Sequence, residues 1–127
     1  MLQITVASDE DSALCPVRNI LAKVTGKWQC LILLALEDGP ERFGKIKRLI
    51  GDITQRVLTQ NLRSLERDGY ITRTVHAGPP LAVSYELTAL GRELVGVLKP
   101  LVTWAAGSFD TVMGSRVAYD RSLRDKT

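Results

Sequence analysis

The sequence has little of the chemistry that catalysis or metal binding requires. Its 127 residues include one histidine, His76, and two cysteines, Cys15 and Cys30, which do not form a C-x-x-C pair. One imidazole excludes a histidine-rich metal cluster, and the cysteine spacing excludes thioredoxin-type chemistry. The phosphate-binding motifs G-x-x-x-x-G-K-[ST] and G-x-G-x-x-G are also missing. We therefore expect no enzyme activity, no metal site and no cofactor.

Long hydrophobic runs are missing as well. The longest apolar run covers the seven residues 30–36, far short of the roughly 20 residues that a membrane-spanning helix needs. No Lys or Arg precedes Arg18, so we expect no secretory or mitochondrial targeting segment. Two cysteines in such a chain indicate a reducing setting rather than a disulfide framework. These features predict a cytoplasmic protein with no membrane partner.

Positive charge is concentrated in the middle of the chain. The whole chain has a net charge of +3, whereas residues 41–76 alone hold eight Lys and Arg against four Asp and Glu, a net charge of +4. A local excess of this kind favours a polyanion as partner, with nucleic acid the first candidate. A solvated helix face is the alternative interpretation of the same charges.

The hydrophobic pattern predicts one domain made mainly of helices. Helical spacing and capping residues predict helices over about 16–24, 27–38, 44–50 and 54–68. A fifth helix begins at Thr88 and is interrupted at Pro100, which gives a kink or a new first turn. A sixth helical stretch then reaches about Met113. Alternating β-branched residues predict a hairpin with strands over 70–75 and 82–87.

This order of elements predicts the fold class. A short helix joined by a tight turn to a longer helix, and then a hairpin, is typical of a helix-turn-helix with a wing. We predict a mainly α fold with a small β-hairpin wing: a winged helix-turn-helix with extra N- and C-terminal dimerisation helices. The domain covers residues 15–113, between a flexible N-terminal tail, 1–14, and a polar C-terminal tail, 114–127, that frays.

The exposed face of the helix at 54–68 is the candidate DNA-reading surface. Arginine can pair with guanine and glutamine with adenine through two hydrogen bonds each, and threonine can bond a base or a phosphate. The face combines these residue types without an intervening acid: Thr54, Gln55, Arg56, Thr59, Gln60 and Arg63. The preceding short helix adds candidate phosphate contacts at Lys45, Lys47 and Arg48, with Arg42 just upstream.

Two further features suggest assembly and regulation. The C-terminal helices hold more apolar residues than one small domain can cover, which predicts a homodimer interface that includes Leu94, Leu98, Leu101, Trp104 and Phe109. Cys15 precedes Pro16 at a helix start, where backbone N–H groups and the helix dipole favour a thiolate. A reactive thiol and a small packed residue are both consistent with that position, whereas Cys30 is expected to be inert core.

Taken together, several motifs resemble those of the HxlR-type winged helix-turn-helix regulators of bacteria and archaea. The matching stretches in the first half of the chain are Cys15-Pro16-Val17, Gly26-Lys27-Trp28, Arg42-Phe43, Leu58-Thr59 and Leu62-Arg63-x-Leu65-Glu66-x-Asp68-Gly69. Those in the second half are Pro79-Pro80, Tyr85-x-Leu87-Thr88-x-x-Gly91 and Leu94 through Trp104. The resemblance implies a dimeric cytoplasmic transcription regulator that binds double-stranded DNA at an inverted-repeat operator. It also makes Cys15 a candidate redox or electrophile sensor, because some members sense through the cysteine of this Cys-Pro motif. No particular small-molecule effector is predicted.

The chain departs from the family pattern at three places. Thr25 stands where the family usually has a second glycine, and Gly96 where it usually has a proline, with Pro100 appearing instead. In the wing, Leu81, Ala82 and Ser84 occupy the region where the family places a basic and an acidic residue. The alternative function is a winged-helix protein–protein interaction module without DNA binding. An acidic or apolar face on the helix at 54–68 would favour that alternative, and the Thr/Gln/Arg face favours DNA.

Overall fold

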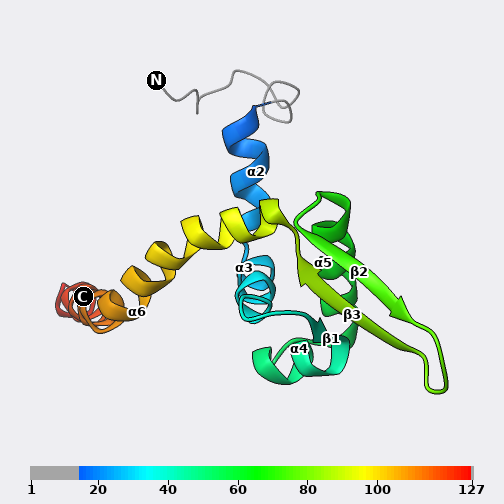
Figure 1. Ribbon diagram of the computed structural model, residues 1–127. Helices are drawn as coiled ribbons and strands as arrows, with labels where there is room; N and C mark the ends of the chain where they lie inside the picture. Colours follow the sequence, from blue (N-terminus) through cyan, green and yellow to red (C-terminus); the bar gives the residue numbers. More distant parts are fainter. Residues whose placement is uncertain (1–14, 127) are drawn as a thin grey trace. The chain divides into compact units, whose positions relative to one another are not determined.

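The computed structural model describes residues 15–126, so the expected N-terminal tail, residues 1–14, lies outside the described residues. The elements follow in the order α2 (Pro16–Val24), α3 (Lys27–Ala35), β1 (Glu41–Arg42), α4 (Phe43–Ile50), α5 (Gln55–Arg67), β2 (Ile71–His76), β3 (Ala82–Leu87) and α6 (Ala89–Asp125), as Figure 1 shows. The chain forms two compact units, and α6 passes from the first, which ends at Val95, into the second, which begins at Gly96.

The core of the first unit lies where α5 packs on α3. Leu58, Leu62 and Leu65 are at most 1% exposed, and their spacing places them on one face of α5. Ile32 and Leu33 of α3 are fully buried, and α3 contacts both α4 and α5. Each such side chain contributes about 1.5–3 kcal/mol through burial. The polar residues of α5 therefore remain on the opposite, outward face.

A small antiparallel sheet completes the first unit. Its strand order is β1-β3-β2, with Arg73 opposite Tyr85 and Arg42 opposite Ser84. The hairpin of β2 and β3 extends beyond the helices (Figure 1), and Gly78 in its turn adopts φ +130°. The predicted mainly helical fold with a hairpin wing is confirmed. The two-residue strand β1 was not predicted, because its pairing with β3 joins distant parts of the sequence.

A hydrogen bond joins the start of α6 to the turn that follows α5. The Thr88 hydroxyl accepts a hydrogen bond from the Gly91 amide at 3.1 Å and donates one to the Gly69 carbonyl at 2.6 Å. A Cβ at Gly91 would lie 2.0 Å from the Tyr70 carbonyl oxygen, so only glycine allows this close approach. The predicted capping role of Thr88 is confirmed.

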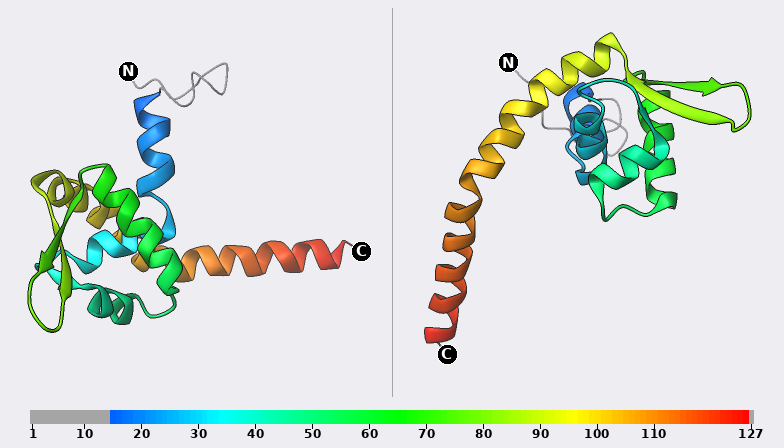
Figure 2. Two further views of the ribbon diagram at one scale, coloured as in Figure 1. Left: turned by 90° about the vertical axis from the view of Figure 1, so that its right-hand side faces the viewer. Right: turned by 60° about the horizontal axis from the view of Figure 1, so that its bottom comes forward.

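The C-terminal half differs most from the prediction. Helix α6 is one helix of 37 residues with Pro100 inside it, and its ribbon is drawn without a break in Figure 2. The new first turn expected as one alternative at Pro100 and the fraying expected after Gly114 are therefore both wrong, whereas a kink at Pro100, the other alternative, is compatible with one helix. Proline removes one backbone donor, but its fixed φ is compatible with a helix. Beyond Gly114 the helix adds local support, since the Ser115 hydroxyl donates to the Thr111 carbonyl at 3.1 Å.

Smaller differences concern helix ends and faces. Helix α3 ends at Ala35 rather than at 38, and α4 begins one residue earlier than predicted, at Phe43. Leu49, expected to point inward with Ile46, is 54% exposed. Ile20 and Leu21 of α2 have the helical spacing of a core face, yet both are about half exposed within one chain. A hydrophobic period identifies a face but not what covers it.

Candidate nucleic-acid interface

A tight turn between α4 and α5 fixes the start of α5. Gly51 adopts φ +92°, a left-handed conformation that favours glycine. Ile53 is 2% exposed and anchors the turn in the core. The Thr54 hydroxyl accepts a hydrogen bond from the Val57 amide at 3.2 Å. Thr54 is therefore the N-cap of α5, as its residue type predicts.

The outward face of α5 brings together the predicted base-reading residues. One shallow hollow on the helix is lined by Gln55, Arg56, Thr59, Gln60 and Arg63. Thr59 is half-buried and the other four are exposed. Among the residues that the structure describes, neither Arg56 nor Arg63 belongs to an ion pair. Both guanidinium groups can therefore pair with acceptors on a base edge or a phosphate.

Thr59 has a narrower role than its residue type suggests. Its hydroxyl donates a hydrogen bond to the Gln55 carbonyl, four residues earlier, at 2.8 Å. This bond uses the only donor of the side chain. Thr59 can still offer a lone pair to a donor or its methyl group to the methyl group of thymine.

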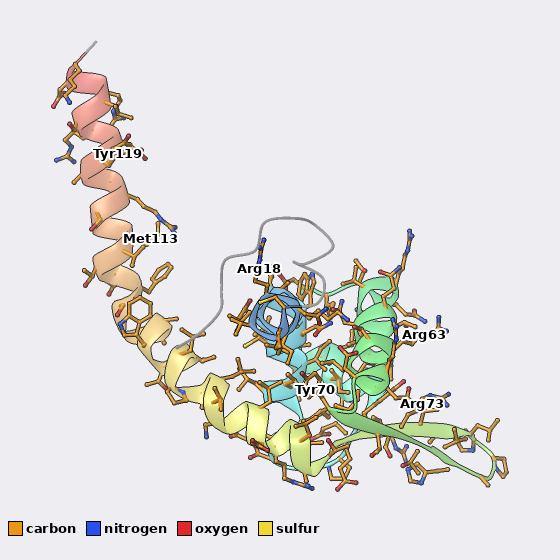
Figure 3. All side chains as sticks on the ribbon, turned by 90° about the horizontal axis from the view of Figure 1, so that it is seen from above. Arg18, Arg63, Tyr70, Arg73, Met113 and Tyr119 are labelled. Atoms are coloured by element: carbon orange, nitrogen blue, oxygen red, sulfur yellow. The ribbon has the colours of Figure 1, made fainter. Side chains whose placement is uncertain are left out.

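A basic residue that was missing from the predicted site lies beside α5. Arg73 of β2 lines a groove of about 520 Å³ together with Gln55, Arg63, Glu66 and Tyr85. In Figure 3, Arg63 on α5 and Arg73 on the hairpin extend to the same side of the first unit. Strand alternation already places Arg73 on the same face as buried Ile71. The position of an arginine on the same strand face as buried Ile71 is the sequence feature that could have identified Arg73 as part of the site.

The basic side chains of α4 do not all point to the same side of the helix. Lys45 and Arg48 line a groove with Arg42, between α4 and the hairpin. Lys47 does not line that groove, because two helical positions rotate it by about 200° from Lys45. Lys45 and Arg48 are exposed and Lys47 is half-buried. The structure thus brings together two of the three predicted phosphate contacts.

The two cysteines occupy different environments. Cys15 is the N-cap of α2 and is only 6% exposed, and its carbonyl accepts a hydrogen bond from the Asn19 amide at 2.9 Å. Cys30 of α3 is half-buried, and burial raises the pKa of its thiol. Cys30 therefore stays a protonated thiol at neutral pH, whereas Cys15 lies buried at the start of α2.

The predicted dimer residues differ in exposure. Leu101, Trp104 and Phe109 are 52%, 64% and 59% exposed, whereas Leu98 is 4% exposed within one chain and Leu94 is half-buried. Leu98 therefore offers almost no free surface. Further along α6, large apolar or aromatic side chains that the prediction did not include are also exposed, among them Met113 and Tyr119 (Figure 3), Val117 and Leu123.

Residues 15–126 contain neither a membrane-spanning helix nor a metal-ligand cluster. In this part of the chain no helix is long and apolar enough to cross a membrane. Over the same residues, His, Cys, Asp and Glu side chains do not gather in threes as a metal ion requires.

Comparison with known proteins gives consistent matches over most of the chain. Residues 23–113 match the HxlR-like helix-turn-helix family. The HTH-type transcriptional regulator YtcD of Bacillus subtilis (strain 168) is 43% identical over 112 residues, which cover 87% of this chain and 89% of that protein. The structure of the transcriptional regulator ytfH from Salmonella typhimurium superposes with a TM-score of 0.76 at 34% identity, covering 87% of this chain and 98% of that one. The oxidised form of the redox regulator HypR superposes with a TM-score of 0.69 at 38% identity, covering 73% of this chain and 96% of that one.

Proposed function

This chain belongs to the HxlR-like helix-turn-helix family and is an HTH-type transcriptional regulator, and from that premise we propose that it binds a specific inverted-repeat DNA operator as a homodimer. Its relatives are transcriptional regulators rather than enzymes. The observation that carries the proposal is the outward face of α5, where Gln55, Arg56 and Arg63 line one hollow directly after a capped helix start. The proposed site of action is the cytoplasm, where bacterial and archaeal DNA lies.

In this proposal α5 enters the major groove. The exposed Gln and Arg side chains read base edges, and Lys45, Arg48 and Arg73 contact phosphates on either side. Thr54 marks the start of α5, where the helix dipole and the backbone N–H groups of the first turn favour a phosphate. Lys47, turned away from Lys45, is the least favoured of the proposed phosphate contacts.

The proposed dimer would cover the exposed apolar residues of α6. Leu101, Trp104 and Phe109 are each more than half exposed in one chain, and a second copy is the simplest partner for such a surface. A twofold dimer spaces its two recognition helices by about 34 Å, one turn of DNA. A sedimentation experiment at micromolar concentration tests this step, since a monomer with full operator affinity would contradict it.

Cys15 is the proposed point of redox control. One relative in structure is named a redox regulator, and Cys15 is the first residue of the Cys-Pro motif at the start of α2. Under this proposal an oxidant such as diamide accepts two electrons and two protons from two thiols, and Cys15 forms a disulfide with another chain or with a small thiol. The added bond or bulk would change the spacing of the recognition helices and so the affinity for DNA. Operator affinity before and after diamide, in the wild type and in Cys15→Ser, tests this step.

A protein–protein module without DNA binding is the competing function. A protein–protein module does not require arginine and glutamine on the outward face of α5. Arg56 and Arg63 are nevertheless exposed on that face, and neither takes part in an ion pair with another described residue. The discriminating experiment is a titration of the protein with DNA from upstream of its own gene and of the adjacent gene, against shuffled DNA of equal length. We expect tighter binding to one of the natural sequences, and equal weak binding to all would favour the competing function.

A further inference from the structure

The groove between α5 and the hairpin has the size and the lining of a small-molecule site. Its volume of about 520 Å³ lies within the range of roughly 300–1,000 Å³ in which small ligands bind. We call it the α5 groove. Side chains of α5 form one wall, and side chains from the start of α4 and from the hairpin form the other: Gln55, Thr59, Arg63 and Glu66 on α5, and Phe43, Arg73, Val83 and Tyr85 opposite them.

Aromatic and apolar side chains form the least exposed part of the α5 groove. Tyr85 is 9% exposed, and Phe43 and Val83 are half-buried. Val83 and Tyr85 are two positions apart on β3, so both lie on the face of the hairpin that borders the groove. A flat aromatic group can therefore lie against two rings and a branched apolar side chain.

Charged side chains form the exposed part of the same groove. Arg63, Glu66 and Arg73 are all exposed, and the register of the hairpin places Arg73 directly opposite Tyr85, on the same face. Arg63 and Arg73 extend to the same side of the first unit (Figure 3). Within residues 15–126, none of the three charged side chains belongs to an ion pair. Two guanidinium groups and one carboxylate give the groove a net charge of +1, which matches a ligand with one negative charge.

We propose that the α5 groove binds a small aromatic carboxylate, with its carboxylate bound by Arg63 and Arg73 and its ring against Phe43 and Tyr85. Arginine can hold a carboxylate through two parallel hydrogen bonds. A doubly charged phosphate ester matches the net charge of +1 less well, because Glu66 would repel its second charge. A neutral aromatic molecule would leave both guanidinium groups without a partner in the groove.

A ligand in the α5 groove would compete with DNA. Arg63 is proposed above to read a base edge and Arg73 to contact a phosphate, and a bound carboxylate would neutralise both side chains. The aromatic carboxylate and DNA therefore exclude each other, and a rise in the concentration of the ligand releases the protein from DNA. This competition rests on the proposed function, whereas the ligand site does not.

The first test measures ligand binding by the full chain without DNA. Isothermal titration calorimetry compares three probes at equal ionic strength: the aromatic carboxylate 2-naphthoate, its uncharged amide 2-naphthamide, and acetate, which has the charge without the ring. We expect 2-naphthoate to bind one site per chain. The amide and acetate should each bind at least tenfold more weakly, because each lacks one of the two groups that the groove recognises.

The second test locates the site with variants. Arg73→Gln removes one guanidinium group at an exposed position, and Phe43→Leu removes a ring while keeping an apolar side chain. We expect each to weaken binding of 2-naphthoate by about two- to tenfold. Arg67→Gln, a change at an exposed arginine of α5 that does not line the groove, is the matched control and should change the affinity by less than about twofold. If Phe43→Leu fails to fold, the exposed Arg73 variant still decides.

The third test measures the competition by fluorescence anisotropy of labelled DNA from upstream of the protein's own gene. We expect 2-naphthoate to raise the apparent Kd for DNA, and acetate at the same concentration to leave it unchanged, since the ionic strength is equal. The ratio of the two Kd values should fall towards one in Arg73→Gln and stay at its wild-type value in Arg67→Gln.

The outcomes separate this inference from the proposed function. If 2-naphthoate does not bind, or binds the wild type and Arg73→Gln equally, the ligand site is overturned and the regulator function stands. Binding that Arg73→Gln weakens, in a protein that binds no DNA specifically, supports the ligand site and contradicts the proposed function. Binding that Arg73→Gln weakens but that leaves specific DNA affinity unchanged supports the site and overturns the competition.

Discussion

Thr54 has two roles that different substitutions can separate. Its hydroxyl caps α5 through the 3.2 Å hydrogen bond from the Val57 amide, and its place at the helix start brings it next to DNA in the proposed complex. Thr54→Ala removes both roles. Thr54→Ser retains both, and Thr54→Asp retains the cap, because aspartate is among the best N-cap residues, but places a negative charge where a phosphate should lie.

The size of the stability effect follows from the cap. Loss of an N-cap hydrogen bond typically costs about 1 kcal/mol, which for a chain of 127 residues lowers Tm by about 4 °C. We expect this loss for Thr54→Ala, near wild-type Tm for Thr54→Ser, and wild-type or higher Tm for Thr54→Asp, since the negative charge also favours the positive end of the helix dipole.

The DNA assay then separates the two roles. Fluorescence anisotropy at one salt concentration should give Thr54→Ser near wild-type affinity and Thr54→Asp a loss of tenfold or more, about 1.4 kcal/mol, despite its restored stability. If Thr54→Asp binds DNA as tightly as the wild type does, no phosphate lies at the start of α5 and the reasoning about this interface is refuted.

Three further predictions concern other residues. Arg56→Ala or Arg63→Ala should cost about 1–3 kcal/mol on the operator and relax specificity at one base pair, whereas Lys45→Ala should weaken all sequences alike and flatten the salt dependence; equal losses on operator and random DNA would make the arginines phosphate contacts. Gln29 is 8% exposed and donates to the Ser64 hydroxyl at 3.1 Å, and no group of residues 15–126 gives its buried Oε1 a hydrogen bond, so Gln29→Leu with Ser64→Ala should unfold in urea within about 1 kcal/mol of the wild type. A loss of several kcal/mol would show that the pair is required. The pKa of Cys30 is raised above its ordinary value of 9.0, so its contribution to stability is complete at neutral pH and is lost as pH rises past that value; Cys30→Ala should have a flatter stability profile above pH 9, and identical slopes would contradict the burial argument.

The parts of the fold that depend on nearby residues could be predicted from the sequence. Thr54, the leucine stripe of α5 and the turn at Gly51 each act within a few positions, so the helix, its cap and its exposed face were identified correctly. The hairpin could be predicted for the same reason, since alternation and a Gly-Pro turn are local signals.

The parts that depend on distant contacts could not. The strand β1 exists only because Arg42 and Glu41 pair with β3, and Arg73 joins the α5 groove only through the register of the hairpin. Leu49 was predicted to point inward and is exposed, because helical spacing does not specify what packs on each face. Pro100 predicts a kink or a new first turn because an interior proline is costly, and the sequence alone does not show that one helix continues through it.

The central claim is that α5 reads a specific DNA sequence as one half of a twofold dimer. A hydroxyl-radical footprint of the wild-type protein on DNA upstream of its own gene tests it most directly. We expect two protected half-sites of inverted sequence whose centres are about 10 base pairs apart, and protection of one half-site should weaken when its guanines are replaced. Protection that is independent of sequence, or a single isolated patch, would contradict the account.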